Sequence, residues 1–359
     1  MKRLLVLIFT MVVSFVAFSQ PPTPSQIGTG VMGTDAAIVA MGGTGVALCD
    51  NPYAPFWNPA GLALLKGFHM PFSLSARVEN IETAKDWNDL VDIFSKDNPT
   101  VDDFNTARDI AKKISDKTVL AEINPFFALS GNRFAVSIYG MALGSGQVKY
   151  NQRPPEELCE GDVCIHYPGG EVISGDIAGY YLSNLCFSFS GGSNKRLWGV
   201  NIRSINGKYS PYEREITLYK GNVVATYNPY KEETSSALGL DYGLLLLGKD
   251  GTRYGVLLRN INSPKLFSGA NELKLDMDMD VGVAKRYSNG VLAAQWTNAL
   301  TKGRIDLGCE LRWGILALRA GILDGSAVWG IGLGKGNFRL DVASGKTVKE
   351  KAALSFSLF

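Results

Sequence analysis

The chain has 359 residues, enough for one large domain or two ordinary ones. Forty glycines and 10% aromatic residues beside only two histidines favour an exported, strand-rich chain. Lys2 and Arg3 lie in a predicted export signal, and removing it leaves 34 basic against 34 acidic side chains. Without an excess of positive charge, nucleic acid is not expected as a partner.

Residues 1–19 predict a secretory signal peptide. Two basic residues precede the apolar run Leu4–Phe18, and Ala17-Phe18-Ser19 supplies the small-residue exit before Gln20. The run is too short and wrongly flanked for a membrane span, so we expect cleavage. No other segment approaches 18 apolar residues, which argues against a helical membrane protein.

The next segment is rich in glycine and proline. The stretch Met41–Phe68, MGGTGVALCDNPYAPFWNPAGLALLKGF, is too apolar for a linker and too broken for a long helix or strand. Asp35–Met41 predicts one or two helical turns, and Gly42 and Gly43 allow the backbone to fold back closely. Asn58-Pro59 favours extended or turn geometry before the proline. We predict a compact unit over residues 20–66.

From residue 67 onward the dominant hydrophobic period is two, which is typical of strands. One example is the apolar series Leu273, Leu275, Met277, Met279, Val281 and Val283, which alternates with polar residues. Most such segments have 9–13 residues, the length of a tilted membrane-spanning strand, whereas soluble strands usually have about 5–6. About fourteen strands are predicted, near residues 68–78, 120–130, 133–145, 177–190, 196–208, 235–247, 252–262, 273–286, 290–299, 303–313, 315–323, 326–334, 336–344 and 351–359.

The connections between these segments alternate between tight turns and longer loops, as in outer-membrane barrels. In lipid no backbone group finds water, so strands span only in a closed barrel. We therefore predict an all-β fold, a closed antiparallel transmembrane β-barrel of about 14 strands over residues 67–359. Its apolar face points to lipid and its charges line the lumen. Because the signs are interspersed, we favour mutual pairing of these charges over the alternative, a polar conduit. A soluble sandwich is the alternative, but it leaves many apolar residues without a partner.

The first long connection, residues 79–119, predicts a helical external loop. Trp87, Leu90, Val91 and Phe94 follow the spacing of an amphipathic helix. Thr100 with Asp103 resembles a capping box before a second helix that ends near Ile114. Apolar side chains of these helices are candidate ligand-binding residues, namely Trp87, Leu90, Val91, Phe94 and Phe104.

The segments AMGGTGVAL and NPYAPFWNPAGLA resemble the N-terminal signature of FadL-type outer-membrane barrels, nearest the PorV-like and TraF-like branch. The resemblance covers residues 27–65. In that family an Asn-Pro-Ala motif, matched by Asn58, Pro59 and Ala60, lies in a hatch that plugs the barrel. The resemblance implies that residues 20–66 are this hatch, and a barrel of about fourteen strands has a lumen too wide for its own side chains to fill. The candidate hatch and gating residues are Gly42, Gly43, Trp57, Asn58, Pro59 and Ala60.

Catalytic and metal sites are not expected. His69 and His166 are far apart in sequence, and neither Gly-x-Ser-x-Gly nor His-Glu-x-x-His occurs. The glycines of residues 42–45 lack the Gly-Lys-Ser/Thr ending of a phosphate loop. We therefore predict that the protein is not an enzyme and has no cofactor and no metal.

Five cysteines occur in this exported chain. Cys159 and Cys164 lie close together in a predicted external loop, which favours a local disulfide. Cys309 is expected to face lipid and Cys186 the lumen, so both should be unpaired.

The predicted function is a passive transporter or channel for hydrophobic small molecules in the outer membrane of a diderm bacterium, gated by the hatch. The alternative is a non-transporting scaffold or accessory of protein secretion or conjugal transfer. The expected partners are outer-membrane lipid, a hydrophobic small-molecule ligand, the barrel-assembly machinery and, for the scaffold, a secretion partner. The terminal Phe359 resembles the signal that the barrel-assembly machinery recognises.

Overall fold

The computed structural model describes residues 35–358 except for 81–82, 116, 118, 154–155, 161–162, 168–169, 194, 220–221, 230–231, 270–271, 302, 336–337 and 348–350. The predicted signal peptide, residues 20–34 of the predicted hatch and Phe359 lie outside the described residues. Among the helices of the described part, none has the length and apolar character needed to cross a membrane.

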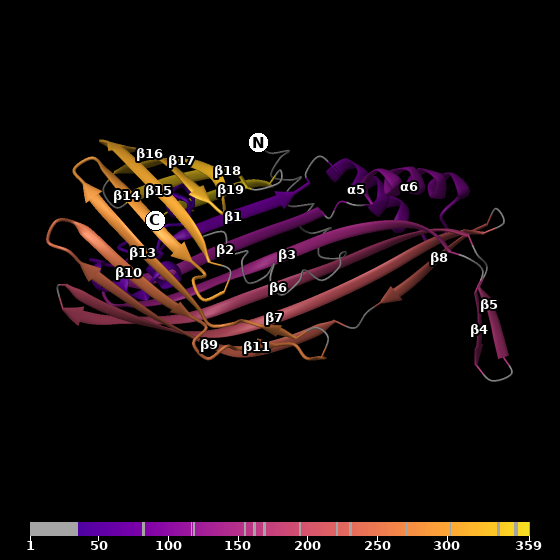
Figure 1. The fold of residues 1–359 in the computed structure, drawn as a ribbon, viewed down its shortest axis with the longest axis horizontal. Coiled ribbons are helices and arrows are strands. Elements are labelled where there is room, and N and C mark those ends of the chain that lie inside the picture. The colour runs from indigo at the N-terminus through magenta and orange to yellow at the C-terminus, as the bar shows by residue number, and fades with distance from the viewer. Residues whose placement is uncertain are drawn as a thin grey trace.

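The described strands of the barrel wall pair antiparallel in one closed circuit (Figure 1). The pairing of β6 with β7 and that of β19 with β1 join what would otherwise be free edges. This confirms the predicted closed barrel of fourteen strands. They are β1 (Phe72–Glu79), β2 (Val119–Gly131), β3 (Phe134–Arg153), β6 (Gly170–Ser193), β7 (Arg196–Tyr219), β9 (Glu233–Leu247), β10 (Thr252–Arg259), β13 (Asp278–Tyr287), β14 (Gly290–Thr297), β15 (Arg304–Trp313), β16 (Leu316–Leu323), β17 (Ser326–Lys335), β18 (Phe338–Thr347) and β19 (Lys351–Leu358).

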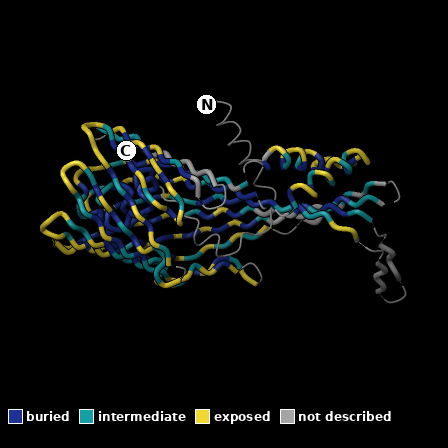
Figure 2. The backbone as a smooth tube through the Cα atoms, turned by 45° about the horizontal axis from the view of Figure 1, so that its top comes forward, coloured by how far each residue is buried: buried dark blue, intermediate teal, exposed yellow. Residues whose placement is uncertain are grey.

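The two faces of the wall differ because side chains alternate along each strand. On β3, Ile138 is 56% exposed outside, while Tyr139 packs inside against Phe56. Figure 2 shows buried residues concentrated within the barrel. Exposed aromatic side chains gather toward the tight-turn end, at Phe134, Phe189, Trp198, Tyr254, Tyr287, Trp313 and Phe338, and toward the loop end, at Trp296 and Trp329. The tight-turn group forms an aromatic belt of the kind that borders the lipid-facing band of a membrane barrel, and the two tryptophans lie toward its opposite border.

One side of the wall is much taller than the other. β6 and β7 have 24 residues each, roughly 80 Å at about 3.3 Å per residue. β14 and β16 have eight, roughly 26 Å by the same rise. The tall side continues past the membrane band as a wall extension, formed by residues 146–153, 170–178 and 209–219, with β8 (Asn222–Pro229) paired to β7. At its far end is the hairpin of β4 (Glu156–Glu160) and β5 (Val163–Tyr167) (Figure 1).

The predicted helical loop is confirmed as α5 (Ala84–Phe94) and α6 (Val101–Ile114). The Thr100 hydroxyl accepts a hydrogen bond from the Asp103 amide at 3.2 Å, and the Asp103 carboxylate accepts one from the Thr100 amide at 2.9 Å. This capping box satisfies the first amides of α6. It also explains why the start of this helix was predictable from sequence.

Residues 35–65, here called the inner segment, lie inside the barrel and are almost entirely buried. The inner segment contains α3 (Ala36–Ala40), α4 (Ala54–Trp57) and the 3-10 helix η1 (Pro59–Leu64). Asp35 caps α3 by accepting a hydrogen bond from the Ala37 amide at 2.9 Å. Apolar residues of the inner segment form one core with wall residues that include Phe126, Leu197, Leu245 and Ala293.

One predicted strand is wrong in part. The alternating series from Leu273 was read as one strand facing lipid, but β13 begins at Asp278. Residues 273–274 form β12, which pairs with β11 (Lys265–Leu266) in a separate hairpin. Leu273 is 2% exposed and packs with inward-facing wall residues. Periodicity could not reveal this change because the hairpin preserves the alternation while the chain turns inward.

Candidate functional site

Asn58 is the main polar anchor of the inner segment. Its side chain is fully buried, and its Oδ1 accepts a hydrogen bond from the Ala60 amide at 3.1 Å. Its Nδ2 has two hydrogens, which are shared among three carbonyl oxygens, those of Val46 (3.1 Å), Leu244 in β9 (3.0 Å) and Val256 in β10 (3.3 Å). One side chain therefore fastens two turns of the inner segment to two strands of the wall.

Glycines of the wall let the inner segment approach this closely. A Cβ added at Gly243 would overlap the Asn58 side chain, and one at Gly308 would overlap the Met41 carbonyl. Equivalent overlaps with the inner segment arise at Gly199, Gly255 and Gly321. Sequence reasoning missed these residues. The sequence did contain a signal for them: several strands have a glycine at a position whose side chain would face the lumen. Such a glycine indicates that another backbone approaches the strand closely.

The other predicted hatch residues also lie in the inner segment. Gly42 and Gly43 have φ of +70° and +78°, the left-handed region that favours glycine. Trp57 is 5% exposed, stacks edge-on against Phe56 at 5.1 Å and leaves no room for a side chain at Gly45. Pro59 starts η1, directly before Ala60. The structure thus brings the six predicted residues into one buried unit.

Charged side chains in the lumen are paired, as predicted. Arg319, with a fully buried side chain, contacts Glu310 at 2.6 Å and Asp341 at 2.8 Å. Arg203 pairs with Asp241 at 2.9 Å, and further described pairs join Arg259 to Asp280 and Arg304 to Asp306. Interspersed pairs of this kind stabilise the interior without producing a field selective for one sign of charge.

Two carboxylates of the inner segment have opposite environments. Burial raises the pKa of Asp35 to about 6, and Asp341 adds to the rise while Arg339 and Arg319 oppose it. Burial alone would also raise the pKa of Asp50, but ion pairs with Arg286 (2.6 Å) and Arg253 (2.8 Å) bring it below its ordinary value. Asp50 therefore stays ionised and ties the inner segment to β10 and β13.

A cavity of about 130 Å³ lies between the inner segment and the tall side of the wall. Phe56 of the inner segment lines one side of the cavity. The other apolar lining residues are Tyr139, Met141, Leu182, Ile205 and Leu275. The polar part consists of Asn124, Asn184, Arg203, Asp241, Arg259 and Asn260. An apolar cavity with a few convergent polar groups is the usual form of a small-molecule site.

The lumen cluster closes this region toward the loop end. We use that name for the buried apolar residues Leu120, Met141, Leu143, Tyr180, Leu182, Ile205, Tyr209, Leu266 and Leu273. The last two come from the β11–β12 hairpin, so that hairpin packs against the inner face of β3, β6 and β7. A solute entering from the loop end would meet the lumen cluster before the cavity.

The predicted ligand-binding residues of the helices lie elsewhere. Successive positions of β3 alternate between the two faces of the wall, so positions 146 and 148 lie on the same outer face as Ile138. Trp87 covers Gly146, and the α5–α6 pair packs on Val148. Trp87, Leu90, Phe94 and Phe104 are buried in this contact and Val91 is half-buried. The helices thus cover the outside of the wall extension, and a ligand-binding role for them stays a prediction.

Among the cysteines whose side chains the structure describes, Cys186 and Cys309 are free, as expected, and Cys49 is free as well. In the β4–β5 hairpin, Cys159 and Cys164 are directly opposite each other in the strand register. Their disulfide stays a prediction.

No protein-family model matches the sequence, and no curated protein matches it. Among solved structures, the chain is similar to the toluene transporter TbuX of Ralstonia pickettii, with 13% identity and a TM-score of 0.54, over 91% of this chain and 97% of that one. It is also similar to a deletion mutant of the monoaromatic hydrocarbon channel TodX, with 11% identity and a TM-score of 0.50, over 91% and 97%. At these identities the likeness shows a shared fold.

Proposed function

We propose that the protein is a passive channel of the FadL type for hydrophobic small molecules in the outer membrane of a diderm bacterium, with the inner segment as its gate. The observation that carries this proposal is the cavity between the inner segment and the wall, whose lining combines apolar side chains with convergent polar groups. The aromatic belt at the tight-turn end and the apolar outer face of the closed barrel support the location. The fold shared with a toluene transporter and a monoaromatic hydrocarbon channel agrees with this class of substrate.

The chemistry of the cavity favours an apolar molecule that carries one hydrogen-bonding group. Tyr139, Met141 and Leu182 offer apolar contact, while Asn124 and Asn184 offer amides. The guanidinium of Arg203 is already paired with Asp241. A fully charged solute would have to compete with such pairs and lose its hydration, so we expect it to be excluded.

Passage requires the inner segment to move, because it spans the interior from β9 and β10 at Asn58 to β15 at Met41. The proposed transport is passive and follows the concentration gradient. The expected partners are the lipid of the outer membrane and the machinery that assembles barrels there.

The test is uptake of a radiolabelled small aromatic alcohol, an apolar molecule with one hydrogen-bonding group, by proteoliposomes. Met141→Trp fills the cavity from the wall and should lower uptake about tenfold or more, because the larger side chain occupies the space that a solute would need. Leu185→Trp changes an outward, 37% exposed position of the neighbouring strand and should leave uptake unchanged. Equal uptake by wild type, Met141→Trp and empty liposomes would contradict a channel through this cavity.

A second function, a scaffold for secretion or conjugal transfer, is favoured by the wall extension. A channel does not need strands of 24 residues, a helical pair and a projecting hairpin on one side. Deleting residues 156–167 removes that hairpin without touching the circuit of the barrel. A scaffold predicts loss of surface delivery of the exported partner with unchanged uptake, whereas a channel alone predicts that neither changes.

A further inference from the structure

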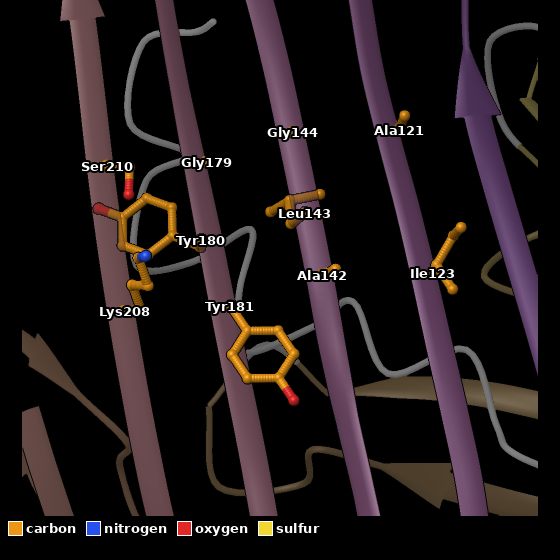
Figure 3. A pocket seen from close by; sticks show the side chains of 10 residues that line it. All are labelled: Ala121, Ile123, Ala142, Leu143, Gly144, Gly179, Tyr180, Tyr181, Lys208 and Ser210. Atoms are coloured by element: carbon orange, nitrogen blue, oxygen red, sulfur yellow. The ribbon is translucent and has the colours of Figure 1, made fainter. Parts of the chain in front are cut away.

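A second cavity, of about 220 Å³, opens on the outside of the barrel, across β2, β3, β6 and β7 (Figure 3). Alternation decides the side: Ala142 and Gly144 have the phase of the exposed Ile138 on β3. Tyr181 on β6 is itself 48% exposed. The outer pocket, as we call it, is therefore separate from the lumen cavity beside Phe56.

The outer pocket exists because small residues occupy adjacent positions of one row. Ala121 is the register partner of Gly144, Gly144 of Gly179, and Gly179 of Ser210. These four positions leave a hollow where larger outward side chains would stand. Leu143 and Tyr180 also border the outer pocket. Both belong to the lumen cluster, so the floor of the pocket is closed from within.

The rim is formed by larger, amphipathic residues. In the next row toward the membrane band, Ile123 pairs with Ala142, Ala142 with Tyr181, and Tyr181 with Lys208. On the opposite side, Trp87 of α5 covers Gly146, the next outward position after Gly144. The outer pocket thus lies between the lipid-facing wall and the helical pair, with a phenol and an ammonium group at its edge.

Its height in the membrane follows from the strands. Tyr181 is eight residues from Phe189 of the tight-turn belt, roughly 20 Å along the axis at a tilt of about 40°. Lys208 is ten residues from Trp198, roughly 25 Å by the same reasoning. The lipid-facing band of such barrels is about 25 Å tall. The rim of the outer pocket is therefore at the external interface, where headgroups meet acyl chains.

We propose that the outer pocket binds one acyl chain of an outer-leaflet lipid whose anionic headgroup contacts Lys208. The pocket continues the lipid-facing surface, so lipid reaches it without crossing water. Lys208 pairs with Glu232 at 2.8 Å, but both side chains are about half-exposed. A pair this exposed contributes little stability, so a headgroup phosphate can replace the carboxylate. The proposal uses the membrane-spanning fold and does not depend on transport.

The experiment counts lipids retained after reconstitution. Wild-type protein is placed in nanodiscs of phosphatidylcholine and phosphatidylglycerol, extracted into mild detergent and examined by native mass spectrometry. We expect one retained phosphatidylglycerol per chain. Ala142→Trp fills the outer pocket from outside and should lower retention about tenfold or more. Ile138→Trp, an outward position four residues away on the same strand, is the matched control and should retain the lipid.

Two further results make the test decisive. Lys208→Gln should keep a retained lipid but lose most of the preference for phosphatidylglycerol over phosphatidylcholine. Uptake by Ala142→Trp should equal that of wild type, so failure of this proposal and failure of the channel are distinguishable. Equal retention by Ala142→Trp and Ile138→Trp in folded, heat-modifiable protein would overturn the proposal. So would retention that ignores the headgroup in wild type.

Discussion

Replacing Asn58 with alanine should release the inner segment while leaving the barrel closed. The substitution removes the acceptor of the Ala60 amide and the donor to the Val46 carbonyl, both inside the inner segment. It also removes the donor to the Leu244 and Val256 carbonyls of the wall. The wall keeps its own ladder of hydrogen bonds, so its closure does not depend on this residue.

The magnitude follows from which groups are left without a partner. A buried amide has one hydrogen, so losing the acceptor of Ala60 costs about 1–3 kcal/mol. A carbonyl oxygen has two lone pairs and loses less when one donor is removed, so the carbonyls of Val46, Leu244 and Val256 together add about 1 kcal/mol. We expect about 2–4 kcal/mol in total. The open state of the inner segment should then be populated about 30 to 1,000 times more.

Cys49 provides the assay because its thiol is fully buried in the inner segment. Burial also raises its pKa to about 12. In the closed state the thiol is therefore both shielded from the reagent and protonated, so it does not react with maleimide. In a protein whose other four cysteines are serine, maleimide labelling of Cys49 reports opening. Asn58→Ala should raise the labelling rate by the factor given above, and planar bilayers should show higher or noisier conductance.

The matched control is Asn262→Ala. Its amide also binds strand backbone, at the Leu238 carbonyl and the Leu240 amide, but on the loop side and away from the inner segment. Labelling of Cys49 should stay at the wild-type rate. If Asn58→Ala also labels at that rate while its barrel is folded, Asn58 is not the anchor and the reasoning from its hydrogen bonds is wrong.

Three other predictions concern the same region and the external hairpin. Gly308→Ala should expose Cys49 to labelling because the new methyl group overlaps the inner segment, whereas Gly334→Ala, which has room, should not; equal labelling would contradict close approach. Asp35 has a raised pKa, so the folded state holds its proton more tightly and stability should fall as the pH rises from about 4 to 6, by up to about 3 kcal/mol. Asp35→Asn should flatten this slope in urea titrations, and an unchanged slope would assign it to other groups. Cys159 and Cys164 should resist thiol labelling until reductant is added, and labelling without reductant would exclude their disulfide.

Local patterns in the sequence were enough for the repeating elements. Period-two alternation located the wall strands because a lipid-facing strand must present apolar residues at every second position. The capping box at Thr100 and Asp103 located α6, because a cap uses only neighbouring residues. The length of β6 and β7 was missed because their outer halves carry no lipid-facing signal.

The tertiary structure decided which residues distant in sequence contact each other. Asn58 reaches carbonyls 186 and 198 residues away in sequence, and no local pattern identifies those partners. The apolar stripe of α5 was visible in the sequence, but only the register of β3 and β6 shows that it covers the outer face instead of the lumen. The wall glycines have meaning only once a second backbone lies against them. Alternation separates two faces of a strand, but which surface covers each face depends on chain segments far away in sequence.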